Sequence, residues 1–477
     1  MRVPSARTRP GPWASAFILI LCMAGAPLAH SQSAPALSPE TRTKIDRAAE
    51  DVLRTTGVPS ASVAIVKDGQ IAYLQAYGDA HVDPRTPARP AMRYSIGSIS
   101  KQFTATAILL LADQGKLTLD DPVGKYLPTL TRANEVTIRE ILSHTSGYQD
   151  YWPQDYVPPF MTHPISAEEI LKIWAHKPLD FDPGTKWEYS NTNYVIAGLI
   201  VEKVSGTPLL QFLSAHIFKP LGMESVANID QDKLGDTDAT GYMRYALGPL
   251  RVAPKEGKGW LFAAGELAMP AEDLAKWDIG MLEQRLLKPA TYKEMQTALR
   301  RKDGVGVRYG LGVFVDTNSG RRILEHGGEV SGFSSENIVF PDDRAAIVVL
   351  TNQDSTGAPS EIGNQIAKAL FAVDNAESAS NQKQAQQILE DLQHGKIDRS
   401  LFTENGSSYF TDDAVKDFSA SLTALGTIEG LTLQRTGHRG GMDYRQYQAK
   451  FAQKMVELSI YAMPDGKIEQ YEVIVPN

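Results

Sequence analysis

β-Strand patterns occur in two regions of this chain that are separated by a long, mainly helical segment. The first region, ASVAIVKDGQIAYLQAYG at residues 61–78, contains two β-rich runs joined at Asp68-Gly69, which is a strong hairpin signal. The second region, residues 308–353, contains the runs RYGLGVFVD, RRILEHGG, GFSSENIVF and AAIVVLTNQ, with turn residues between them. Because short connections favour antiparallel neighbours, we expect one antiparallel sheet assembled from both ends of a domain.

Helical patterns fill the rest of this domain. Residues 39–56 predict a helix that begins at Ser38 and ends before Gly57, and residues 361–372 predict a closing helix. The segment from about 98 to 300 is mainly helical by pattern. We therefore expect an α+β fold with two lobes: an antiparallel sheet flanked by the N- and C-terminal helices, and a mostly helical lobe. A cleft between such lobes is a usual place for a binding site.

A polar stretch, DNAESASNQKQAQQ at residues 374–387, follows this domain and lacks core residues. We interpret residues 376–390 as a linker and the start of a helix. Residues 391–477 contain a short helix and then β-rich runs, which predict a separate small α+β domain. The main domain then covers residues 32–375.

The first 31 residues have the three-part pattern of a secretory signal peptide. Three arginines precede the apolar run WASAFILILCMAGAPLA, and Ala29-His30-Ser31 offers small residues at the usual cleavage spacing. We expect cleavage there and a periplasmic or secreted protein, with membrane contact only before cleavage; an uncleaved anchor is the alternative. The single cysteine, Cys22, lies inside this run, so a mature chain without it excludes disulfides, thiol catalysis and zinc–thiolate sites.

The charge of the chain argues against a nucleic-acid partner. The net charge is −8 and the pI is about 5.7, and the sequence has no basic stripe that would neutralise phosphates. The histidines form no H-x-x-x-H or H-x-H pair, so we expect no metal site. We expect no cofactor either.

The stretch SIGSISKQFTA at residues 95–105 contains a candidate nucleophile. Residues three apart on a helix lie on one face, with Cβ atoms roughly 5–6 Å apart, so Lys101 can accept a proton from Ser98 if burial lowers its pKa. Ser100 points to another face, and Ser95 precedes the helix. Taken alone, S-x-x-K is more often a chance pattern in which the serine caps a helix.

Two further motifs carry suitable chemistry. Tyr189-Ser190-Asn191 lies just before a predicted helix; Tyr189 can shuttle a proton if the charge of Lys101 lowers its pKa, and Asn191 can hydrogen-bond a substrate amide. Glu325-His326-Gly327-Gly328-Glu329 ends a predicted strand, and its glycines permit a close backbone approach to a ligand. Taken alone, each of these two motifs is more often structural than catalytic.

Together these motifs resemble the serine β-lactamase and penicillin-binding-protein superfamily, on the side of the class C β-lactamases, D,D-peptidases and esterases. The resemblance covers about residues 40 to 372. It rests on the three motifs above and on the connecting segments GKLTLDDPVGKYLP, TIREILSHTSG, FDPGTKWEYSNTNY, AAGELAMPAEDLAKW and YGLG. The resemblance implies a class C β-lactamase-like fold.

The resemblance also implies roles for the residues of the first two motifs. Ser98 would be the nucleophile and Lys101 its activator. Tyr189 would shuttle protons and protonate the leaving group, and Asn191 would orient Lys101 and the substrate. His144 is read as structural, because the family has a helix-end turn at that segment.

The third motif would bind and orient the substrate. His326 stands where true β-lactamases have a lysine, and Gly327 replaces a hydroxyl residue. Gly328 would let the strand edge pair with substrate. By analogy, the backbone N–H groups of Ser98 and Glu329 would form the oxyanion hole. Because histidine is largely neutral near pH 7, these changes weaken a clamp on a substrate carboxylate.

We therefore expect a serine hydrolase of the peptidase or esterase type that forms an acyl-enzyme on Ser98 from a small-molecule or peptide amide or ester and acts weakly on β-lactams. The alternatives are a non-catalytic penicillin-recognising or sensor protein and a structural wall-binding protein. The C-terminal domain is loosely similar to cystatin-like or nuclear-transport-factor-like domains.

Overall fold

The computed structural model describes residues 37–154, 156–231, 234–318, 320–371 and 375–474. The predicted signal peptide, residues 1–31, lies outside these ranges. Among the described residues, no single helix has the length and apolar composition to cross a membrane; Asn191–Ser205 and Leu209–Leu221 pass that test only as a pair, which is bent by 72°.

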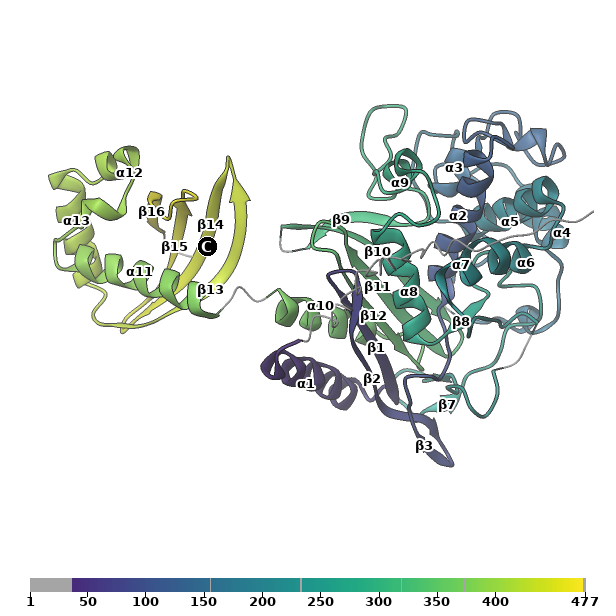
Figure 1. Cartoon of the computed structure of the whole chain (residues 1–477), viewed down its shortest axis with the longest axis horizontal. Helices are drawn as coiled ribbons and strands as arrows, with labels where there is room; N and C mark the ends of the chain where they lie inside the picture. The colour runs from purple at the N-terminus through teal and green to yellow at the C-terminus, as the bar shows by residue number, and fades with distance from the viewer. Residues whose placement is uncertain (1–36, 155, 232–233, 319, 372–374, 475–477) are drawn as a thin grey trace, which may run out of the picture. The chain divides into compact units, whose positions relative to one another are not determined.

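A seven-stranded antiparallel sheet forms the centre of the first domain, in the order β3-β2-β1-β12-β11-β10-β9 (Figure 1). It combines strands from both ends of the domain, as the sequence predicts. The strands are β1 (Ser60–Lys67), β2 (Gln70–Val82), β3 (Arg85–Pro87), β9 (Phe314–Asn318), β10 (Arg321–Val330), β11 (Phe333–Phe340) and β12 (Ala345–Thr351).

The hairpin between β1 and β2 forms where the sequence predicts it. Asp68 and Gly69 both have positive φ, which is the backbone of a two-residue hairpin turn. The strand predicted from Arg308 begins later, at Phe314, because the preceding residues form a turn in which the Gly310 N–H donates to the Val313 carbonyl at 2.8 Å.

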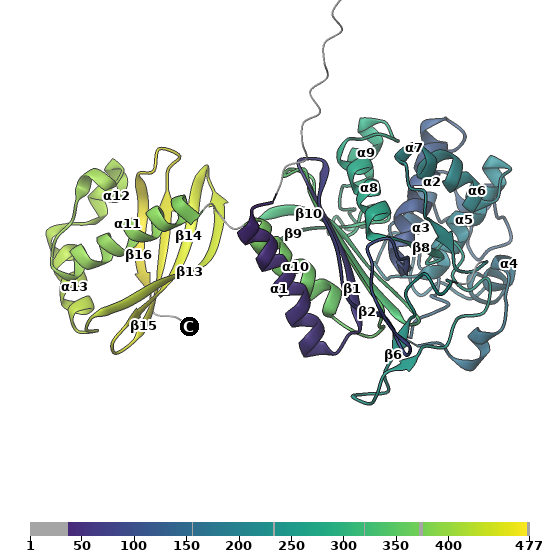
Figure 2. The same cartoon turned by 60° about the horizontal axis from the view of Figure 1, so that its bottom comes forward.

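Helices cover both faces of this sheet. Helices α1 (Pro39–Thr56) and α10 (Ala358–Leu370) pack on each other and on one face (Figure 2). Ser38 caps α1 and Gly57 ends it in a left-handed conformation, as the sequence predicts. Helix α8 (Ala271–Leu282) packs on the other face, against β1 and β12.

The segment between β3 and β9 forms the second, mainly helical lobe. Helix α2 (Ser100–Asp113) packs on α5 (Asn191–Ser205) at the centre of this lobe. Ser166 and Glu169 form the predicted capping box at the start of α4 (Ala167–Ile170), which continues as a short π-helical turn. Its other elements are α3 (Ile138–Leu142), α6 (Leu209–Leu213), α7 (Lys219–Leu221), α9 (Pro289–Met295), β4 (Tyr94–Ser95), β5 (Ala227–Asn228), β6 (Tyr242–Met243), β7 (Arg251–Val252) and β8 (Leu267–Met269).

Residues 375–474 form a small α+β unit with its own core. Its antiparallel sheet has the order β13-β14-β15-β16, and the fold class agrees with the sequence prediction. The segment interpreted as a linker is helical from Asn375, because Ala385, Ile388, Leu389 and Leu392 recur at helical spacing and are buried. The elements are α11 (Asn375–Gln393), α12 (Glu404–Tyr409), α13 (Asp412–Thr423), β13 (Ile428–Arg439), β14 (Met442–Phe451), β15 (Met455–Ala462) and β16 (Ile468–Ile474).

Candidate active site

Ser98 and Lys101 are in direct contact. Ser98 lies in a 3-10 turn, Gly97–Ile99, rather than in the α-helix itself, and the turn runs directly into α2. Residues three apart eclipse each other in a 3-10 turn, so Lys101 Nζ still lies 2.9 Å from Ser98 Oγ. The neighbouring Ser100 points elsewhere, since its Oγ accepts a hydrogen bond from the Leu267 N–H at 3.2 Å. Of the three serines in this stretch, Ser98 is the one that contacts Lys101.

The other two partners of the Lys101 amine can only accept hydrogen bonds. They are Asn191 Oδ1 and the Ala264 carbonyl, each 2.8 Å from Nζ. Two N–H bonds are thereby committed, and the third position on nitrogen faces Ser98 Oγ. Lys101 is fully buried, and this burial lowers its pKa to about 7, with Asp150 opposing the shift. In the neutral amine, the third position is a lone pair directed at the Ser98 hydroxyl.

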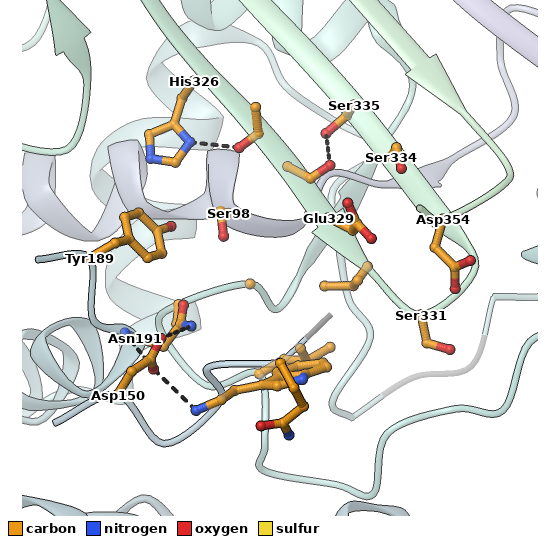
Figure 3. Close-up of a pocket in the computed structure, with 18 of the residues that line it drawn as sticks. Ser98, Asp150, Tyr189, Asn191, His326, Glu329, Ser331, Ser334, Ser335 and Asp354 are labelled. Atoms are coloured by element: carbon orange, nitrogen blue, oxygen red, sulfur yellow. Dashed lines mark hydrogen bonds between the residues drawn. The ribbon is translucent and has the colours of Figure 1, made fainter. Parts of the chain in front are cut away.

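Tyr189 lies beside both groups. Lys101 Nζ is 5.0 Å from the centre of its ring, and Figure 3 shows its hydroxyl on the side of the ring nearest Ser98. Burial raises the pKa of Tyr189 above its usual value. The condition that the sequence sets for a proton shuttle here, a Tyr189 pKa lowered by Lys101, is therefore not met, and the phenol stays protonated. Its oxygen is buried without a hydrogen-bond partner among the described residues.

Asp150, which the sequence analysis missed, holds Asn191 in place. Its carboxylate accepts hydrogen bonds from the Asn191 backbone N–H at 2.9 Å and from Asn191 Nδ2 at 3.2 Å (Figure 3). The side-chain amide is thereby fixed with Oδ1 toward Lys101. Asp150 is a lone carboxylate in a loop, and its only sequence signal is its place just after the family-like segment that ends at Gly147.

His326 is neutral and engaged by the chain at both ring nitrogens. Nδ1 lies 2.6 Å from the Gly327 carbonyl, so Nδ1 donates, and Nε2 then accepts from the Tyr309 hydroxyl at 2.9 Å. Burial, together with the charge of Lys101, lowers the pKa of His326 to about 3. The predicted weakness of a positive clamp at this position therefore has a structural basis.

Glycines allow β10 to approach the Ser98 turn. A Cβ on Gly328 would lie 1.9 Å from the Ile96 carbonyl oxygen, and one on Gly97, whose φ is +52°, would lie 2.6 Å from Glu329 N. The backbones of Ser98 and Glu329, the predicted oxyanion hole, are therefore neighbours. β9 pairs with β10 only up to Glu325, so in the described structure the outer edge from His326 onward is open to a ligand.

His144 packs against Tyr189 and does not contact Ser98 or Lys101 through a described hydrogen bond. Its Nδ1 accepts from the Ser190 N–H at 3.1 Å, and its ring stacks on Tyr189 with centres 4.3 Å apart. Its pKa lies well below the usual value because the ring is buried, with Lys101 and His326 adding to the effect. This geometry suits the structural role predicted for it.

A cavity of about 600 Å³ opens at these residues. All the predicted site residues except Lys101 line it, and Lys101 lies buried in contact with Ser98. The predicted residues on its wall are Ser98, Tyr189, Asn191, His326, Gly327, Gly328 and Glu329. The structure thus gathers one nucleophile, one buried amine, one phenol and an open strand edge at a single cavity.

Comparison with known proteins decides the family. The sequence model of the Beta-lactamase family matches residues 45–370, most of the chain. The chain belongs to the beta-lactamase family. Among curated relatives of this family member, Protein flp of Staphylococcus aureus is 31% identical over 341 residues, covering 68% of this chain and 65% of the relative. The chain therefore spans less than two thirds of that relative's length.

Solved structures of the family share this fold. A D-stereospecific amidohydrolase from Streptomyces sp. is 28% identical with a TM-score of 0.61, over 70% of this chain and 99% of the other. The octameric penicillin-binding protein homologue from Pyrococcus abyssi covers 91% of this chain and 99% of its own, with 24% identity and a TM-score of 0.62. The second likeness shows the fold alone.

Proposed function

We propose that this beta-lactamase-family protein is a serine hydrolase that forms an acyl-enzyme on Ser98 from an amide or ester. The observation that carries the proposal is the hydrogen-bond arrangement at Lys101. Two acceptor-only partners use two of its N–H bonds, and the remaining position faces Ser98 Oγ at 2.9 Å. A buried amine with a pKa of about 7 is a suitable general base at neutral pH.

Acylation begins when Ser98 Oγ attacks the substrate carbonyl carbon and its proton passes to Lys101 Nζ. The carbonyl oxygen takes up the negative charge beside the N–H groups of Ser98 and Glu329. The bond to the leaving group then breaks, and Tyr189, a neutral phenol in the resting state, donates a proton to that group and recovers one from Lys101. Because the Tyr189 pKa is raised, Lys101 and not a tyrosinate is the base.

Deacylation uses the same groups in the second half of the cycle. A water molecule attacks the acyl carbon, and its proton passes to Lys101. The bond to Ser98 Oγ then breaks, Oγ regains a proton, and the free acid leaves. Asp150 contributes by keeping Asn191 Oδ1 on Lys101, which keeps the third position of the amine on Ser98.

Amides and esters fit this site better than β-lactams. The neutral His326 supplies no cation for the carboxylate that penicillins carry. The family membership and the likeness to a D-stereospecific amidohydrolase support an amide substrate.

Hydrolysis of p-nitrophenyl acetate by two serine variants tests this proposal. Ser98→Ala should lose at least about 10³-fold in kcat, because a catalytic nucleophile acts as one unit with its base. Ser100→Ala is the matched control, a buried serine two residues away that should retain activity. Full activity in Ser98→Ala with loss in Ser100→Ala would reject the assignment, and a folded, inactive wild type would favour a non-catalytic binding protein.

A further inference from the structure

The cavity at Ser98 is lined by carboxylates. No Lys or Arg side chain is among the described residues on its wall, although Lys101 lies buried against Ser98. The acidic residues of the wall are Asp150, Glu188, Glu329, Glu336 and Asp354. Such a wall repels the carboxylate that peptide substrates and penicillins present, and attracts a cation.

Glu336 is the carboxylate that the sheet places best for a ligand. It lies on β11 directly across from Gly327 of β10. Cross-strand neighbours share one face of the sheet, and glycine leaves the space above its partner empty. A Cβ built on Gly327 would find its nearest neighbour, the Ser335 carbonyl oxygen, at 3.7 Å. A ligand group in the cavity can therefore reach Glu336 by extending across Gly327.

Glu336 also lacks a charge partner. It is 9% exposed, and a hydrogen bond from the Ser360 hydroxyl is its side-chain contact. No described Lys or Arg forms an ion pair with it. The burial of Glu336, with a smaller contribution from the charge of Glu325, raises its pKa to about 7. A buried carboxylate without a cation is costly, and a bound ammonium would offset that cost.

Ser334 provides an independent sign of a ligand. Its hydroxyl is buried, with 4% of the residue exposed, and has no hydrogen-bond partner among the described residues. Ser334 lines the same cavity, two residues before Glu336 on β11, and thus on the same face of the strand. Buried hydroxyls normally have a partner, so this oxygen is available to an N–H donor in the cavity.

Arg308 lines a hollow next to the cavity but pairs with a different carboxylate. Arg308 and Glu336 both line a second hollow, which adjoins the cavity at Gly327 and Ser360. The Arg308 guanidinium forms an ion pair with Asp316 and also opposes, in part, the rise that burial causes in the pKa of Glu325. Its charge is thus partly offset by Asp316.

We propose that the acyl group taken by Ser98 carries a protonated amine, which passes over Gly327 and binds Glu336 and Ser334. The substrates are aminoacyl amides or esters with a free amine. The proposal rests on the serine-hydrolase function above and names its substrate class. Glu336 would bind the ammonium by a charge-assisted hydrogen bond, and Ser334 Oγ would accept a second N–H.

Paired substrates measure this preference. The pairs are p-nitroanilides of D-alanine, L-alanine and 6-aminohexanoic acid, each compared with its N-acetyl counterpart. For the wild type, kcat/KM should be about tenfold or more higher for the free amine in at least one pair, as expected for a charge-assisted contact. In Glu336→Gln this ratio should fall to about one, since the amide keeps the shape but loses the charge.

Two further variants keep the test decisive. Glu325→Gln is the matched control. Glu325 lies on the same face of β10 as Gly327, but it lines the second hollow and not the cavity at Ser98. It should keep or raise the wild-type ratio, because the loss of Glu325 removes a charge that raises the pKa of Glu336. Gly327→Ala adds a methyl group that the fold accommodates, and should lower kcat/KM for the free amine in the preferred pair.

The outcomes separate this inference from the proposed function. Equal kcat/KM within every wild-type pair, or a ratio that falls in Glu325→Gln and persists in Glu336→Gln, would overturn the amine site while leaving serine hydrolysis intact. Hydrolysis of p-nitrophenyl acetate that persists in Ser98→Ala would instead overturn the proposed function.

Discussion

At the scale of single residues, the pKa of Lys101 sets the pH dependence. Its pKa falls from 10.5 to about 7 on burial, so the base form prevails above this pH and the protonated, inactive form below it. We expect kcat/KM for a neutral ester to rise with pH and level off above about 7. His326, with a pKa of about 3, does not titrate in this range. A pH–rate profile between 5 and 9 checks this, and a rate that falls as pH rises through 7 would contradict it.

Asp150 gives a second prediction at this scale. In Asp150→Asn, the new amide cannot accept from both Asn191 donors, so Asn191 should turn away from Lys101 and kcat should fall by about tenfold or more. Loss of the carboxylate also removes the charge that raises the Lys101 pKa, so the rise in rate should move to lower pH.

The pH profile distinguishes positioning from simple destabilisation in this variant. Asp182→Asn, which changes a carboxylate with 72% of its side chain exposed, is the control and should leave the profile unchanged. A lower melting temperature for Asp150→Asn with an unmoved profile would assign Asp150 a structural role only.

The sequence predicts part of this chemistry. Ser98, Lys101, Tyr189 and Asn191 follow from motif spacing and resemblance, and the structure brings them together. The role of Asp150 does not follow from the sequence, because a single carboxylate in a loop forms no motif. Its role depends on the fold, which places that loop beside the start of α5. The direction of the Tyr189 pKa shift also needed the burial of the ring, which spacing does not reveal.

At the scale of elements, the site depends on the close approach of β10 to the Ser98 turn. Ala at position 97 would adopt a left-handed backbone and place its methyl group against Glu329 N. We expect Gly97→Ala to lower the free energy of unfolding by about 2–5 kcal/mol, from backbone strain and overpacking together.

Gly206 is the control for this prediction. It ends α5 with φ +71°, and a Cβ there meets nothing within 4 Å. Gly206→Ala should cost only the backbone term, about 1–2 kcal/mol. Denaturant unfolding measures both variants, and equal losses would show that the contact with Glu329 is unimportant.

The elements were more predictable than the wall of the cavity. Turn residues identify the β1–β2 hairpin, and helical spacing with caps identifies α1. The pairing of Gly327 with Glu336 depends on a register that the turn at Ser331-Gly332 sets. Once the strand bounds are known, that register follows from the sequence; the burial of Glu336 does not.

At the scale of the whole molecule, the hydrophobic cores are separate in sequence. The cores around the large sheet use residues between Leu37 and Ala367, and that of the small unit uses residues between Ala385 and Tyr471. We expect a chain that ends at residue 374 to fold cooperatively and to hydrolyse p-nitrophenyl acetate. Calorimetry and activity of the shortened protein check this. A shortened chain that aggregates or unfolds without a transition would show that the small unit is needed for folding.

The acyl-enzyme on Ser98 is the central claim, and a fluorophosphonate label tests it most directly. Trypsin releases the peptide YSIGSISK, residues 94–101, which contains three serines. Fragment masses from labelled wild-type protein should therefore place one phosphonate on Ser98 and none on Ser95 or Ser100. A label on Ser95, on Ser100 or elsewhere, in protein that hydrolyses esters, would contradict the account.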